Sequence, residues 1–190
     1  MTTIVTILTE GYADWESALL NAVARQHYGI TTLFATPGGQ PVTSAAGLRV
    51  TPDIAAENLD PADFDVLVVN GGVAWSQPDA PDVSAPLRGA RDAGRIVAGI
   101  CDGTVALARA GLLDAVAHTS NSPENLPPTG YRGAGRYRDQ PGAVTDDRVI
   151  TAPGTAPVSF MTAVLEALGL RNDELDYYVG LHAAEHRATG

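Results

Sequence analysis

The chain has 190 residues, of which 45% are apolar and 18% are charged, with 20 glycines and 13 prolines. This length and apolar content suffice to bury a core, which excludes a disordered chain, and we expect a single domain over residues 1–190. The formal net charge is −10, and all 12 lysine or arginine positions are arginine. The negative charge disfavours nucleic-acid binding, and the absence of lysine excludes Schiff-base and P-loop lysine chemistry.

No apolar run approaches the ~20 residues of a membrane-spanning helix, so no membrane partner is expected. At the N-terminus no cationic segment precedes an apolar stretch, and Thr2–Val5 already has the composition of a strand. We therefore expect a cytoplasmic protein. The single cysteine, Cys101, excludes an internal disulfide and a multi-thiolate metal site. No metal ion or organic cofactor is predicted.

In the first half of the chain, short β-branched runs alternate with segments of helical periodicity. Residues Val42–Val50 are predicted to form a small hairpin or an extended excursion. The other predicted elements are strands at Ile4–Leu8, Ile30–Ala35 and Asp65–Val69, and helices at Asp14–Tyr28 (ending at Gly29) and Asp82–Ala93.

The same alternation continues in the second half. Thr119–Arg138 is rich in Pro, Gly, Asn and Ser, which predicts a loop with one short helical turn. The predicted elements are strands at Arg95–Ile100 and Val149–Thr151, and helices at Thr104–Leu113, Pro157–Leu168 and Asp173–Arg187. Together they predict an α/β fold, with a mostly parallel sheet and helices on both faces.

In such sheets, ligands bind beyond the carboxyl ends of the strands. Three predicted strand ends carry unusual residues: Glu10–Glu16, Asn70–Gly72 and Gly99–Thr104. In the third, a buried strand runs directly into a helix, and glycines stand two residues on either side of Cys101, which is the spacing of a nucleophile elbow. Because a helix N-terminus stabilises a thiolate, Cys101 is the candidate nucleophile, with an inert buried thiol as the alternative.

Residues near the other strand ends have two interpretations each. The Gly71-Gly72 turn brings backbone N–H groups toward Cys101 as oxyanion donors, or it is a tight turn that needs glycine. A phosphate cradle is disfavoured because no GxGxxG or GxxxxGK[ST] pattern occurs.

Aromatic and hydroxyl side chains in these loops are also ambiguous. Trp15, Trp75 and Tyr12 line the mouth of a pocket or belong to the core. Thr155 follows Pro153-Gly154 and lines the pocket or caps the next helix.

Taken together, the motifs resemble the DJ-1/PfpI (ThiJ/PfpI) superfamily. The Asp-Trp-Glu and Thr-Ser-Asn-Ser motifs are most similar to its bacterial amidotransferase-like branch. The resemblance implies a flavodoxin-like three-layer sandwich, related to the class I glutamine amidotransferase fold, and commonly a homodimer. The matching segments follow the family's order over nearly the whole chain and are Gly11–Glu16, Val68–Gly72, Gly99–Gly103, Ala108–Leu113, Thr119–Asn121 and Ile150–Ala156.

The resemblance also implies roles for single residues. Cys101 resembles the elbow cysteine, and Glu16 matches an acidic residue that donates a hydrogen bond to the thiolate when protonated. The N–H groups of Gly72 and Asp102 match the oxyanion donors. From the residues alone, a carboxyl group desolvated beside a thiolate has a raised pKa and acts as an acid or base, whereas a solvated first-turn residue is the alternative for Glu16.

Two positions depart from the family pattern. Asp102 stands where many hydrolytic members have a histidine directly after the cysteine, and Asn121 stands where others have a loop histidine. No Cys–His pair follows, which counts against a papain-like peptidase. Asp102 either acts as a base or caps the helix N-terminus, and its orientation decides between the two. His118 is expected to face elsewhere, and the histidines expected on helix surfaces are His27, His182 and His186.

The leading hypothesis is a cysteine-nucleophile enzyme that acts on a small electrophilic molecule by hydrolase, hydratase (lyase) or glyoxalase-type chemistry. Cys101 attacks, Glu16 moves protons with or without Asp102, and the N–H groups of Gly72 and Asp102 hold the developing charge. The alternatives are a non-enzymatic redox or stress sensor in which Cys101 is oxidised, a glutamine amidotransferase-like or peptidase activity, and a binding module with an inert thiol. The residues predicted to line the substrate pocket are Trp15, Gly71, Trp75, Asn121 and Thr155.

Overall fold

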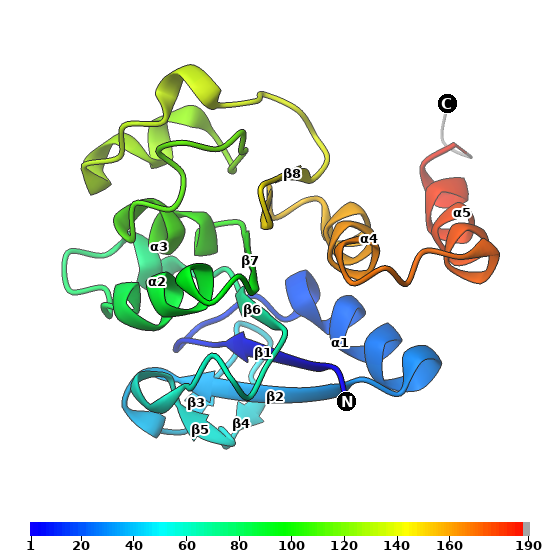
Figure 1. The fold of residues 1–190 in the computed structure, drawn as a ribbon, viewed down its shortest axis with the longest axis horizontal. Helices are drawn as coiled ribbons and strands as arrows, with labels where there is room; N and C mark the ends of the chain where they lie inside the picture. The colour runs from blue at the N-terminus through cyan, green and yellow to red at the C-terminus, as the bar shows by residue number, and fades with distance from the viewer. Residues whose placement is uncertain (188–190) are drawn as a thin grey trace.

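A seven-stranded sheet forms the centre of the computed structural model, which describes residues 1–187 (Figure 1). Its strands are β1 (Thr3–Ile7), β2 (Thr31–Thr36), β5 (Ile54–Ala55), β6 (Val66–Val69), β7 (Ile96–Ile100), β8 (Val144–Asp146) and β9 (Val149–Ala152). The strand order is β5-β2-β1-β6-β7-β9-β8, and every pair is parallel except β8 with β9. The predicted mostly parallel sheet is confirmed.

Helices cover both faces of this sheet, because alternate strand residues point to opposite sides. Val5 and Val97 pack with the helices α2 and α3, whereas Ile4 and Ile96 pack with α1 and α4 on the opposite face (Figure 1). Helix α5 lies beside α4 and buries Leu175. The three-layer, flavodoxin-like arrangement agrees with the expectation from the sequence. The helices are α1 (Asp14–Tyr28), α2 (Ser84–Asp92), α3 (Gly103–Arg109), α4 (Pro157–Ala167) and α5 (Asp173–Arg187).

Several connections differ from the prediction. Of the two alternatives for Val42–Val50, the hairpin is correct, with β3 (Val42–Thr43) antiparallel to β4 (Arg49–Val50). The predicted helix Thr104–Leu113 ends earlier, at Arg109, and the predicted loop Thr119–Arg138 contains three 3₁₀ turns instead of one. Within residues 1–187, no helix is both long and apolar enough to cross a bilayer.

The sheet order places the candidate site. Strands β1, β6, β7 and β9 are neighbours and run in the same direction. Their carboxyl ends therefore lie along one edge of the sheet, and the segments that follow Ile7, Val69, Ile100 and Ala152 meet there.

Candidate active site

Cys101 occupies the sharp turn between β7 and α3. Its backbone φ of 56° lies in the left-handed region, which residues with a side chain rarely adopt. The Cys101 N–H donates to the carbonyl oxygen of Ala152 at 2.9 Å, and the Thr104 hydroxyl donates to the Cys101 carbonyl at 2.6 Å. The thiol is half-buried at the sheet edge. This strand–turn–helix geometry agrees with the predicted nucleophile elbow.

Glu16, in the first turn of α1, lies against the sulfur. Its side chain is fully buried, and Oε2 accepts a 2.8 Å hydrogen bond from the Gly71 N–H. Oε1 has no nitrogen or oxygen partner among the described residues. A Cβ added to Gly154 would lie 2.9 Å from this Oε1 and 3.0 Å from Cys101 Sγ, so both atoms border the same small space. The alternative of a solvated Glu16 is therefore wrong.

Burial controls the protonation of Glu16. It raises the pKa of this carboxyl group to about 7 from an ordinary 4.5, against hydrogen bonds from Cys101 and Gly71, and the nearby charge of Asp102 also favours the protonated form. Near neutral pH the group therefore exists in both states, as a general acid or base requires.

The thiol itself is harder to ionise than expected. Burial raises the pKa of Cys101 to about 12, hydrogen bonds from Asn121 and the Asp102 N–H oppose this, and negative charge on Glu16 adds to it. Burial and the neighbouring carboxylate therefore act against a thiolate, and its stabilisation by the helix N-terminus stays a prediction. The sulfur must lose its proton during attack, and Glu16 is adjacent to receive it.

The unfolding free energy should depend on pH because the Glu16 carboxyl group is buried. Because the folded-state pKa of Glu16 is raised, folding is favoured while the group is protonated, and that contribution disappears as pH rises from about 4.5 to about 7. Relative to Glu16→Gln, the wild type should lose about 3 kcal/mol of unfolding free energy between about pH 5 and pH 8. Urea unfolding of both proteins at the two pH values measures this difference. Parallel pH dependences of the two proteins would contradict it.

The Asp102 side chain turns toward the site instead of capping α3. It makes no capping hydrogen bond to the helix. Oδ2 accepts from the Ser76 hydroxyl at 2.8 Å, and Oδ1 accepts from Asn121 Nδ2 at 3.0 Å. Of its two interpretations the cap is thus wrong, and the role of Asp102 as a base stays a prediction.

The amide of Asn121 is oriented by its neighbours. Its Oδ1 accepts the Gly154 N–H at 2.9 Å, which leaves Nδ2 to donate to Cys101 Sγ at 3.1 Å as well as to Asp102. Asn121 therefore contacts the sulfur as the alignment of its loop predicts. An amide donates to sulfur but does not take its proton, so this residue does not act as a base.

The two glycines after β6 have distinct roles. A Cβ on Gly71 would lie 2.1 Å from Glu16 Oε2 and 2.5 Å from Cys101 Cβ, so this position must be glycine for the carboxyl group and the thiol to approach each other. The Gly72 N–H donates to no acceptor among the described residues, as an oxyanion donor requires. The oxyanion role of Gly72 and Asp102 stays a prediction.

The aromatic residues divide between core and surface. Trp75 is fully buried in the core and donates its indole N–H to the Asn70 carbonyl at 2.8 Å, so its predicted place in the pocket is wrong. Tyr12 is also buried. Trp15 is 58% exposed and donates to the Gly154 carbonyl at 3.2 Å.

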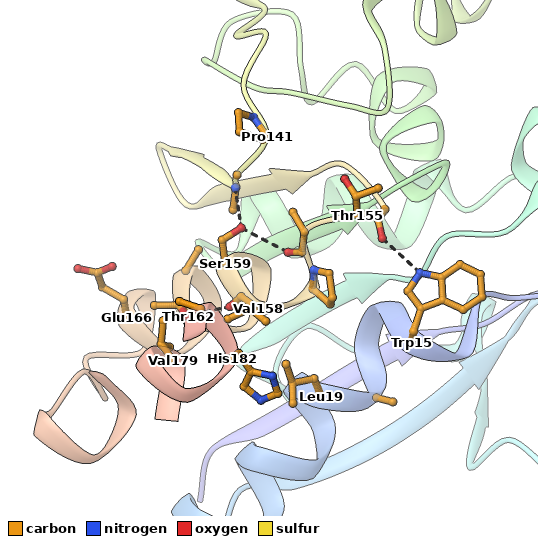
Figure 2. A pocket seen from close by; sticks show the side chains of 18 of the residues that line it. Trp15, Leu19, Pro141, Thr155, Val158, Ser159, Thr162, Glu166, Val179 and His182 are labelled. Carbon is orange, nitrogen blue, oxygen red and sulfur yellow. Dashed lines mark hydrogen bonds between the residues drawn. The ribbon is translucent and has the colours of Figure 1, made fainter. Parts of the chain in front are cut away.

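A groove of about 1290 Å³ runs between α1, α4 and α5 (Figure 2). Trp15 and Thr155 lie at one end, where the indole is hydrogen-bonded to the 154–155 segment (Figure 2). Cys101 does not line this groove. Thr155 therefore faces the groove, and Gly154 is the residue of this loop that abuts the sulfur.

No histidine within the described part of the chain contacts the sulfur. His118 is fully buried, with Nδ1 at 2.8 Å from the Val116 carbonyl and Nε2 at 2.9 Å from the Tyr131 hydroxyl, so the expectation that it faces elsewhere is confirmed. His27 is exposed and pairs with Glu174 at 3.3 Å. His182 is half-buried beside the groove, and the His186 side chain lies outside the described residues.

Comparison with known proteins places this geometry in a family. Residues 2–167 match the DJ-1/PfpI family. The chain belongs to the DJ-1/PfpI family. A DJ-1 superfamily protein, Atu0886 from Agrobacterium tumefaciens, has a crystal structure that superposes with a TM-score of 0.95 at 46% identity, covering 98% of this chain and 100% of that one.

Two curated relatives carry names that suggest enzymes. YoaZ of Bacillus subtilis, named an uncharacterized protease, is 32% identical over 67% of this chain, which spans 61% of the length of YoaZ. The glutathione-independent glyoxalase DJR-1.2 of Caenorhabditis elegans is 31% identical over 74% of this chain and 74% of its own length. The family assignment made from the motifs is confirmed.

Two contributors to this DJ-1/PfpI site escaped the sequence analysis. Gly154 was noted only as part of a loop, yet it forms a wall against Glu16 and Cys101. The sequence indicates this role of Gly154 only indirectly, because the contact depends on β9 lying next to β7 in the sheet. Ser76, which holds Asp102, sits in a 3₁₀ turn after β6 and has no sequence signal that distinguishes it from other loop serines.

Proposed function

We propose that this DJ-1/PfpI protein is a Cys101-dependent enzyme that acts on a small electrophilic carbonyl compound. The observation that supports the proposal is the buried Glu16 carboxyl group, whose free Oε1 borders the same space as the Cys101 sulfur. A buried carboxyl oxygen without a nitrogen or oxygen partner costs stability, and an acid/base role explains its position beside the thiol.

The first chemical step follows from the two pKa values. With Glu16 ionised and Cys101 protonated, the sulfur attacks the carbonyl carbon while its proton passes to Glu16 Oε1. A carbon–sulfur bond forms, and the carbonyl electron pair moves to oxygen. The proposed donor to that oxygen is the N–H of Gly72, which donates to no acceptor among the described residues. Water then releases the product and regenerates the thiol.

Aldehydes with a neighbouring ketone are the substrates we favour. In the adduct of a 2-oxoaldehyde, Glu16 first gives the thiol proton to the adduct oxygen, which becomes a hydroxyl group. The ionised Glu16 then takes the proton from the sulfur-bearing carbon and delivers it to the adjacent carbon, while the hydroxyl proton passes to the former ketone oxygen and a thioester forms. Hydrolysis of the resulting thioester yields a 2-hydroxy acid, so the overall reaction adds one water. A relative named glyoxalase supports this choice. Peptidase or glutaminase chemistry is less favoured, because no imidazole among the described side chains, which are those of residues 1–184, contacts Cys101 to protonate an amine leaving group.

The pH dependence of turnover tests the role of Glu16. Because the base must be ionised, kcat/KM should fall as pH decreases through an apparent pKa near 7. Glu16→Gln should reduce kcat/KM by about 10²–10⁴-fold and abolish this limb of the profile. Steady-state kinetics between about pH 5 and pH 9 measure both effects. An unchanged limb in Glu16→Gln would assign the titration to another group.

The substrate class is tested by a screen. Glyoxals, amides, esters and isocyanides are incubated with the wild type and with Cys101→Ala, and product formation is followed by mass spectrometry. The proposal expects turnover of glyoxals that requires Cys101. Turnover that persists in Cys101→Ala, or no turnover of any carbonyl compound, would refute it.

A redox sensor is the second candidate. Asn121 Nδ2 donates to Sγ, and a protonated Glu16 would be a further donor to oxygen atoms bound to sulfur. However, peroxide reacts with the thiolate, and the raised pKa of Cys101 keeps the resting site in the thiol form. Selective addition of two oxygens to Cys101 under mild peroxide, followed by mass spectrometry, would favour the sensor over the enzyme.

Three further expectations stay predictions. They are the homodimer implied by the family, the cytoplasmic location, and the assignment of residues 1–190 to one domain. Sedimentation equilibrium of the full chain measures the first of these directly.

A further inference from the structure

The chain segments that build the site around Cys101 carry only negative formal charges. Four acidic residues, Glu10, Asp14, Glu16 and Asp102, occur in the segments that build the site, and these segments contain no arginine, lysine or histidine. Those segments are residues 8–17, 70–76, 99–105, 119–122 and 152–156. None of the ion pairs among the described side chains, those of residues 1–184, involves Glu16 or Asp102, so none of these side chains neutralises the two carboxyl groups nearest the sulfur.

The Asp102 carboxyl group is held by two hydrogen-bond donors. Its Oδ2 accepts from the Ser76 hydroxyl, and its Oδ1 accepts from Asn121 Nδ2. Asn121 Nδ2 donates to Asp102 Oδ1 and to Cys101 Sγ together. Sulfur and carboxylate therefore share one donor, and any molecule that reaches the sulfur comes close to this negative charge.

We propose that this site selects neutral or cationic carbonyl substrates and excludes anionic ones, with Asp102 as the residue that sets this specificity. This inference rests on the proposed function, because the selected molecules are substrates only if the protein is the proposed enzyme. The physical reason is that repulsion between like charges is several times stronger in a partly buried site than in water. A 2-oxo carboxylate or the carboxylate of a free amino acid would meet Asp102 without a cation to receive it.

The test uses two alkylating agents that differ in charge, iodoacetamide and iodoacetate. In each reaction a bond forms between Sγ and the methylene carbon, iodide leaves with its electron pair, and the thiol proton passes to Glu16 or water. Because Cys101 is the only cysteine, mass spectrometry of the intact chain measures both rates at one atom. The ratio of iodoacetamide to iodoacetate rates should be at least about tenfold higher than for 2-mercaptoethanol. An equal ratio would overturn the proposal.

Variants assign the effect to one residue. Asp102→Asn should lower the rate ratio by at least about threefold, mainly by accelerating iodoacetate. The matched control is Asp63→Asn, which removes the same charge just before β6, at the opposite edge of the sheet, and should leave the ratio unchanged. A folded Asp102→Asn with the wild-type ratio would overturn the role of Asp102. If that variant does not fold, the ratio in the wild type must decrease as salt rises from about 0.02 M to about 0.5 M, and a constant ratio overturns the proposal.

A measurement of turnover distinguishes failure of this inference from failure of the proposed function. 2-Oxopentanal is neutral and 4,5-dioxopentanoate is an anionic 2-oxoaldehyde of similar size, so the wild type should consume 2-oxopentanal at least about tenfold faster than 4,5-dioxopentanoate. If neither is consumed but the alkylation ratio holds, the charge selection stands and the proposed carbonyl chemistry fails. If both are consumed equally, the chemistry stands and the charge selection fails.

Discussion

Cys101→Ala is expected to reduce kcat/KM for a glyoxal substrate by at least about 10⁴-fold, because the variant has no atom that can form the covalent bond. Glu16 and the Gly72 N–H remain in place, so the residual rate measures what the surrounding groups do to a bound substrate and water. The Tm should change little, since alanine occupies the same left-handed backbone position and the thiol is only half-buried. Steady-state kinetics and thermal unfolding measure the two quantities.

A second substitution makes this result specific. Cys101→Ser keeps the size of the side chain and a hydroxyl group, but an alcohol is a far weaker nucleophile than a thiol beside the same base, so a loss of at least about 10³-fold is expected. Both variants are purified as the wild type is, which also exposes contaminating activity. Activity within about tenfold of the wild type in either folded variant would show that Cys101 is not the nucleophile.

Gly71→Ala is expected to damage both the fold and the site. The added Cβ would lie 2.5 Å from Cys101 Cβ and 2.1 Å from Glu16 Oε2. The Cys101 Cβ belongs to a strained turn and cannot move freely, so Glu16 must leave its hydrogen bond to the Gly71 N–H. We expect a loss of about 2–4 kcal/mol in unfolding free energy and at least about 10²-fold in kcat/KM.

Gly89→Ala is the matched control for this substitution. Gly89 lies inside α2, where an added Cβ would make only an ordinary 3.6 Å contact with Pro61. Alanine in a helix interior should stabilise the protein by about 0.5–1 kcal/mol and leave the reaction unchanged. Urea unfolding should therefore show changes in unfolding free energy of opposite sign for the two variants, and steady-state kinetics should show a loss of activity in Gly71→Ala alone. A Gly71→Ala protein with wild-type stability and activity would show that the carboxyl group and the thiol do not need this close approach.

Much of the fold was predictable, because strands that are buried on both faces of a sheet give continuous apolar runs in the sequence. The run Asp65–Val69 predicts β6, and Arg95–Ile100 predicts β7 to within one residue of its observed start. The short edge strands β5 and β8 were missed, since two or three residues do not establish a period. The order of the strands was not predictable either, because it depends on crossovers and not on local sequence.

The candidate site divides in the same way. Cys101 stands out locally, through a buried strand, flanking glycines and a following helix. The position of Glu16 against the sulfur depended on family resemblance, since a first-turn glutamate is ordinarily exposed. Gly154 and the direction of the Asp102 carboxylate depend on which strand lies beside β7 and on side-chain packing. The burial that raises the pKa of the thiol could not be predicted, because burial is a property of the assembled fold.

The left-handed backbone at Cys101 has a consequence for laboratory evolution of this protein. A residue with a side chain costs about 1 kcal/mol in that conformation, and glycine does not. A library ranked by heat resistance alone would therefore enrich glycine at this corner and discard the reactive atom. Thermostable variants of this protein must be sorted with a thiol-directed label at every round, so that thermal stability is not gained by losing the Cys101 thiol.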